Sequence, residues 1–255
     1  MGRFMKWQVT VVLCGVIGVG AAGSAQEQAH EDLRAYVQSD SFPQSYRQVS
    51  EALDSSATPE LVAMLGSSAL KATDWRRAAG VLGVVGDERA VEPLIEFVSR
   101  PEPQQPMPQT HDDARMAALM ALGGIVNRTG DERALNYLID SLTPRVWRQR
   151  KIDGLPSRAS SYAEYDLELS KYAVFGLALS GNARAGEALE LLDESPAPEQ
   201  VQFRRSLGTT LPQWLEVHRL VAERGIAGMY EYYESRRQLE AEQKTEEARR
   251  LREGR

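Results

Sequence analysis

Three short segments of the chain carry a glycine, a carboxylate or carboxamide, and an arginine in the same order and at the same spacing. They are Gly86-Asp87 with Arg89, Gly130-Asp131 with Arg133, and Gly181-Asn182 with Arg184. Carboxylates and guanidinium groups can bind a charged ligand, but Asp and Asn are also preferred N-terminal caps of helices. Because one such residue recurs at the same place in each copy, we interpret all three as helix caps. We expect the three arginines to support a neighbouring turn, so these residues are predicted to be structural.

Residue types suited to metal or nucleophilic chemistry are scarce. The histidines are His30, His111 and His218, and only His30 is followed by a glutamate. The one cysteine is Cys14, and the sequence contains no phosphate-binding glycine loop, nucleophile elbow or zincin motif. We therefore predict no catalytic residue, no metal site, no cofactor and no enzymatic activity.

Positive charge is concentrated in residues 144–158, which carry five basic side chains against one aspartate in an otherwise acidic chain. The segment also holds a tryptophan, and Trp and Arg are enriched at the hot spots of protein interfaces. We hypothesise that it contacts an acidic partner protein; the alternative is a solvated loop packed by Trp147. The candidate partner-binding residues are Arg145, Trp147, Arg148, Arg150, Lys151 and Arg158. A second insertion, the proline-rich residues 100–109, is expected to be a stiff spacer.

The apolar residues around each repeated turn have the spacing of helices. Before the first turn, Ala78, Leu82 and Val85 share one stripe, and the same spacing follows the turn. Gly86 is expected to end the first helix in the left-handed conformation, and Asp87 to cap the second. A helix pair of this kind cannot bury its apolar stripes alone, so the pairs must stack on one another.

Regions of weaker signal flank these three units. Thr58 as N-cap, with Pro59 at the first helical position, predicts a degenerate terminal repeat before them. Residues 197–233 are predicted to form a C-terminal helical cap. Residues 234–255 are nearly all charged residues and helix formers, which predicts a solvated helical tail, with a partner-binding helix as the alternative.

The stretch from Arg76 to Leu94 reads RRAAGVLGVVGDERAVEPL. It resembles the HEAT-like repeats of the phycobilin lyase family, in which an alanine-rich helix ends in Leu-Gly and the next opens on Gly-Asp-x-Arg-Ala-Val-x-Pro-Leu. The resemblance implies an all-α fold: a short right-handed α-solenoid of about four HEAT-like helix pairs over residues 41–196, with extra C-terminal helices. It implies little about function, because the matching residues build the turn and the packing.

The N-terminus has the pattern of a secretory signal peptide over residues 1–25: two basic residues, the apolar run of residues 9–19 and small residues before Ala25. We expect cleavage there, a mature N-terminal segment of residues 26–40, and a periplasmic location. The net charge of −6 becomes −8 once Arg3 and Lys6 are removed, which argues against nucleic acid as a partner.

These features predict an exported, non-enzymatic HEAT-like scaffold that binds an unidentified protein. One alternative is an accessory subunit or lyase-like protein that holds a small ligand in the solenoid groove. Another is a membrane- or cell-wall-associated structural factor, with membrane contact expected only if the signal peptide is not cleaved.

Overall fold

The computed structural model describes residues 33–39, 42, 45–102 and 104–253, and every named element in these ranges is helical. The signal peptide, Cys14 and His30 lie outside the described residues. The helices are α2 (Leu33–Gln38), α3 (Tyr46–Ala52), α4 (Thr58–Gly66), α5 (Ala72–Val85), α6 (Val91–Ser99), α7 (Gln109–Thr129), α8 (Glu132–Asp140), α9 (Pro144–Gln149), α10 (Tyr162–Ser180), α11 (Ala183–Glu194), α12 (Pro198–Leu207) and α13 (Thr210–Glu253), with 3-10 turns η1 (Ser55–Ala57) and η2 (Glu88–Ala90). None of the helices in the described part is both long and apolar enough to cross a membrane.

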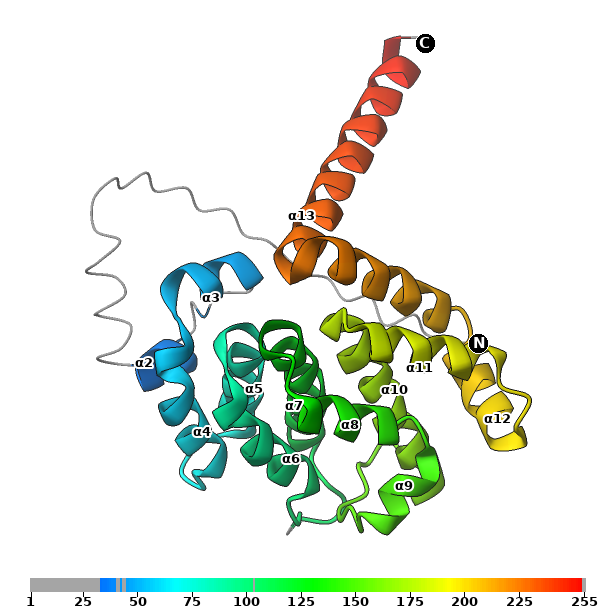
Figure 1. Ribbon diagram of the computed structural model, residues 1–255. Coiled ribbons are helices and arrows are strands. Elements are labelled where there is room, and N and C mark those ends of the chain that lie inside the picture. Colours follow the sequence, from blue (N-terminus) through cyan, green and yellow to red (C-terminus); the bar gives the residue numbers. More distant parts are fainter. Residues whose placement is uncertain (1–32, 40–41, 43–44, 103, 254–255) are drawn as a thin grey trace.

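Four successive helix pairs form the body of the molecule (Figure 1). The pairs are α3 with α4, α5 with α6, α7 with α8, and α10 with α11. The first helices contact one another in the order α3, α5, α7, α10, and α7 and α10 also contact their own partner helices, α8 and α11. The all-α solenoid expected from the sequence is therefore confirmed. Its core includes Leu82 and Leu122, both fully buried as their helical spacing predicts.

Glycines let the first helices approach one another at backbone distance. A Cβ atom on Gly124 of α7 would lie 2.1 Å from the carbonyl oxygen of Gly83 in α5. On the other side of α7, a Cβ on Gly123 would lie 1.9 Å from the carbonyl oxygen of Gly176 in α10. Two adjacent glycines of one helix thus hold both neighbouring repeats close, because no side chain fits between the backbones.

Two details of the turns differ from expectation. Gly86 was expected to be left-handed, but it is extended, with φ −62° and ψ 157°. Glycine is required there because a Cβ would lie 2.5 Å from the carbonyl oxygen of Leu82. Left-handed glycines do follow the next two first helices, Gly130 with φ 68° and Gly181 with φ 57°. In the terminal repeat the cap is Asp54, which accepts from the Ser56 N–H, whereas Thr58 is buried one 3-10 turn later.

The two insertions pack together beside the body of the solenoid. The Met107 N–H donates to the carbonyl oxygen of Leu155 at 2.9 Å, and the Met107 side chain is fully buried. A Cβ on Gly154 would lie 2.6 Å from the Cβ of Glu102. The proline-rich segment is therefore anchored to the second insertion instead of spanning solvent as a free spacer.

The C-terminal helices continue the stack and then leave it. α12 and the first part of α13 pack against α10 and α11, and α13 kinks at Gly225, where φ is 70° and ψ is 173°. Beyond the kink the helix reaches back to α3, and its last part projects away from the body (Figure 1). One helix therefore runs through both the expected cap of residues 197–233 and the expected tail from residue 234.

Candidate binding groove

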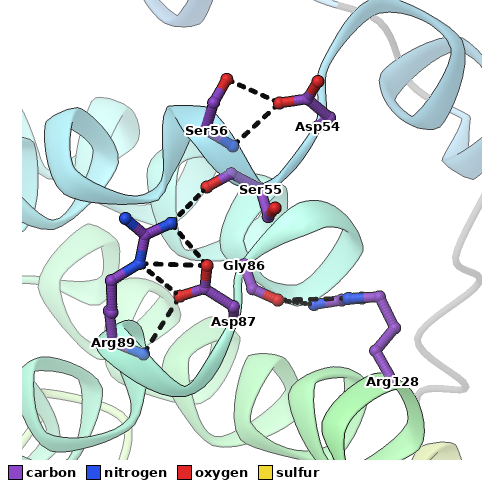
Figure 2. Close-up of polar contacts among 7 residues, drawn as sticks. All are labelled: Asp54, Ser55, Ser56, Gly86, Asp87, Arg89 and Arg128. Carbon is purple, nitrogen blue, oxygen red and sulfur yellow. Dashed lines mark hydrogen bonds and ion pairs between the residues drawn. The ribbon is translucent and has the colours of Figure 1, made fainter.

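The repeated polar residues link each turn to the turn of the preceding repeat (Figure 2). Asp87 accepts from the Arg89 N–H at 3.1 Å, and the Arg89 guanidinium donates to Asp87 and to the carbonyl oxygen of Ser55 at 2.9 Å. The hydrogen bond from Arg89 holds the pKa of the Asp87 carboxyl below its usual value. The Asp87 carboxylate thus caps its own turn and holds Arg89, and the Arg89 guanidinium reaches the preceding repeat.

The same linkage recurs at the other two turns. Asp131 accepts from the Arg133 and Ala134 N–H groups, and Arg133 reaches the carbonyl oxygen of Glu88, 3.3 Å away in the preceding turn. Asn182 accepts from the Arg184 N–H, and Arg184 pairs with the Glu132 carboxylate. The terminal repeat has Ser56 at the arginine position, and Asp54 caps that turn by accepting from the Ser56 N–H.

Sequence reasoning missed a second set of turn contacts at the end of α7. Arg128 donates to the carbonyl oxygen of Gly86 at 3.1 Å (Figure 2). It also donates to the carbonyl oxygen of Val84 at 2.6 Å, so both acceptors belong to the C-terminal end of α5. Asn127 donates from Nδ2 to the carbonyl oxygen of Ser180, at the end of α10. The two residues therefore satisfy helix ends on both neighbouring repeats. The one sequence signal that could have suggested these contacts is the helical spacing of residues 124–129, the insertion before Gly130, which places Asn127 and Arg128 in the last turn of α7.

The basic segment is largely folded into the protein. Trp147 is fully buried and donates from Nε1 to the Ser170 Oγ at 3.0 Å. The Arg150 guanidinium lies over the rings of Tyr137 and Trp147, at 3.9 and 4.8 Å from their centroids, and donates to the Ser141 Oγ. Burial lowers the pKa of Arg150.

The remaining basic residues of this segment divide into side chains with an ion-pair partner and side chains without one. Arg148 pairs with Asp166 at 2.9 Å, and Arg158 donates from Nε to the fully buried Asp112 at 2.8 Å. Arg145 and Lys151 are exposed. Charge reversal at Arg150 would disturb its buried contacts, and charge reversal at Arg148 or Arg158 would break an ion pair. Partner binding by this segment can therefore be tested cleanly only at Arg145 and Lys151.

The first helices α3, α5, α7 and α10, together with α13, also form a groove of about 870 Å³. Its floor consists of small and flexible side chains from α5 and α7, among them Gly80, Gly83, Ala117, Met120 and Gly124. The lining positions on α7 run from Gln109 to Gly124, a length of about 22 Å at the helical rise per residue. An apolar, elongated depression therefore follows the direction of the first helices.

The two ends of the groove differ in chemistry. The end near the N-termini of α5, α7 and α10 carries charged groups, including Arg76, Asp113 and Glu168. The Arg76 side chain is exposed and makes no hydrogen bond or ion pair with any other described residue, and the Asp113 carboxylate accepts only from Gln109. The opposite end is apolar and is lined by Val84, Leu179 and, from α13, Ile226 and Tyr230. Only one end can thus meet charged groups of a ligand.

Tyr172 marks the inner border of the charged end. Burial, with the nearby Glu168 carboxylate, raises the pKa of its hydroxyl to about 12. The phenol is therefore neutral at physiological pH and can serve as a hydrogen-bond donor in the groove. Within the described ranges, no three His, Asp or Glu side chains gather closely enough to hold a metal ion.

The comparisons with known proteins agree with this architecture. A family model described as the PBS lyase HEAT-like repeat matches residues 76–100. The match covers most of α5, the η2 turn and α6, and thus part of the groove floor. A search of curated proteins gives no match to the chain.

Proposed function

We propose that this HEAT-like repeat chain is an exported, non-enzymatic scaffold that binds an extended, largely apolar segment of a partner protein in its groove. The supporting observation is the shape of the groove, about 870 Å³ distributed over about 22 Å of helix length. An extended segment suits a groove of this elongated shape, because its side chains alternate between the floor and the opening along its whole length.

The chemistry of the lining supports the same class of ligand. Glycine, alanine and methionine side chains form a floor that accommodates different apolar residues, because methionine adapts its shape readily. Arg76 and Asp113 at the charged end are available for opposite charges on the bound segment. At the extended rise of about 3.3 Å per residue, the groove accepts about seven residues.

The proposal is tested by crosslinking from the floor of the groove. A photoreactive residue at Ala117, in the full chain in its own compartment, should crosslink to a polypeptide segment that mass spectrometry can map. A synthetic peptide of that segment should then bind the purified chain. Recovery of a small metabolite or chromophore in place of a polypeptide would favour the lyase-like alternative and overturn this proposal.

A matched pair of glycine variants shows whether binding takes place in the groove. Gly80 lines the groove, Gly66 does not, and a Cβ atom on either glycine would meet nothing within 4 Å. Gly80→Leu should therefore fold normally while filling the groove, and should weaken peptide binding by about tenfold or more. Gly66→Leu should leave binding unchanged, and equal affinities for the two variants would contradict the assignment.

Export rests on the signal-peptide pattern alone. N-terminal sequencing of the protein recovered from cells should give a chain that starts at Gln26. A chain that begins at Met1 and sediments with membranes would support the membrane-associated alternative. Binding of an acidic partner through Arg145 and Lys151 stays a separate prediction.

A further inference from the structure

The C-terminal helix α13 has two parts with different contacts. Before the kink, Leu220 and Val221 pack on Ala178 of the last helix pair, and His218 Nε2 lies 3.0 Å from the carbonyl oxygen of Asn182. After the kink, Ile226 and Tyr230 line the apolar end of the groove. The first part therefore caps the solenoid, and the second part covers the groove.

The second part also joins the last repeat to the first. The Tyr230 ring stacks on Tyr46 of α3, with centroids 5.4 Å apart and planes at 23°. Next to it, Arg47 and Glu231 form an ion pair at 3.2 Å in which both side chains are more than 60% exposed. An ion pair this exposed contributes little. The closure therefore depends on the stacked tyrosines and on the buried side chains of Ile226 and Met229, which pack in the same cluster as Leu220 and Val221.

The position of this second part is set by one residue. Gly225 has φ 70° and ψ 173°, a backbone region that is accessible almost only to glycine. A Cβ atom there would meet nothing within 4 Å, so backbone conformation, and not crowding, is what requires glycine. A different conformation at Gly225 would redirect everything after it and would take Ile226 and Met229 out of the apolar cluster that they share with Leu220 and Val221.

We infer that residues 226–233 are a strap hinged at Gly225, which lifts from α3 to admit a polypeptide to the apolar end of the groove and closes over it. This inference rests on the proposed function, because it concerns access to the same groove. With the strap closed, Tyr46 and Tyr230 bridge the first and last repeats above the apolar end. A bound segment would add contacts to Ile226 and Tyr230 and so favour the closed position.

The test needs no partner, so its outcome is independent of whether the groove binds a polypeptide. In the full chain with Cys14→Ser, a cysteine replaces Leu179, which lines the groove beside Ile226 and packs against the cluster that holds Ile226 and Met229, and its alkylation by a maleimide is timed. Gly225→Ala places a non-glycine residue in the strained region and should shift the strap toward the open position. We expect alkylation to accelerate by about tenfold or more.

A control cysteine at Ala188, a half-buried position of α11 that does not line the groove, reports on loosening of the whole fold. Its alkylation rate should be the same with Gly225 and with Gly225→Ala. An unchanged rate at position 179, or equal acceleration at both positions, would overturn the hinged strap. Circular dichroism of each variant verifies that the helices are retained.

Discussion

At the scale of single residues, the turn carboxylates combine capping with linkage between repeats. The pKa of Asp87 is lowered in the folded protein by its hydrogen bond from Arg89. A carboxyl with a lowered folded pKa stabilises the fold above its unfolded pKa of about 3.9, and this contribution is lost as the pH falls through the folded value. Asp87→Asn keeps the cap, because the two residues cap about equally well, but it removes the titration.

We therefore expect Asp87→Asn to lose less stability than the parent chain between about pH 5 and pH 2. The measurement is the melting temperature across that range, followed by circular dichroism. Asn182 shows that an amide is accepted at this position, since it caps α11 in the same way. The same acid dependence in parent and variant would mean that Asp87 is not linked to folding through its charge.

The basic segment shows what residue types alone cannot specify. Trp147 and Arg150 have the composition of an interface hot spot, and that composition is equally suited to a buried tryptophan with a stacked guanidinium. The partners of these side chains, Ser170 and Tyr137, are remote in the sequence or belong to another helix. Nothing in the spacing of the segment separates the two arrangements, whereas the capping role of Asp87 follows from local sequence.

At the scale of helices, the leucine and the glycine of each Leu-Gly pair have separate roles. The leucines were predictable as core from their period of three and four residues. The glycines were not, because their role depends on the distance between backbones of neighbouring repeats. The contrast with Gly80, which belongs to no Leu-Gly pair, illustrates this, since Gly80 faces open space and Gly123 meets the backbone of α10.

Gly123→Ala and Gly80→Ala should therefore change stability in opposite directions. Gly123→Ala must push α7 and α10 apart and should lower the free energy of unfolding by about 1–3 kcal/mol or more. Gly80→Ala should raise it by up to about 1 kcal/mol, because alanine is the better helix former and no atom obstructs its Cβ. Urea unfolding of both variants measures the difference, and a loss of stability at Gly80 would show that the groove floor is tighter than described.

At the scale of the whole molecule, the stack of repeats is closed by elements that the repeat pattern does not describe. The pattern predicted four pairs and a C-terminal cap, but it carried no information on where α13 goes after Gly225. Tyr46 and Tyr230 belong to the first and last elements of the stack, and no local signal connects them. A glycine in a helical pattern suggests an interruption, but it does not give the direction in which the chain continues.

Chains that end at Arg224 and at Ser195 should separate the cap from the strap. The first chain loses Ile226 and Met229, two buried side chains, which are worth about 3–6 kcal/mol together. It should still unfold cooperatively, at a lower melting temperature.

The second chain also loses the buried Phe203, Leu207, Leu211, Val217, Leu220 and Val221. That loss, about 10 kcal/mol or more, is comparable to the whole stability of a domain, so this chain should bind a hydrophobic dye and lack a cooperative transition. A chain ending at Ser195 that melts like the full protein would show that the solenoid is stable without its C-terminal helices.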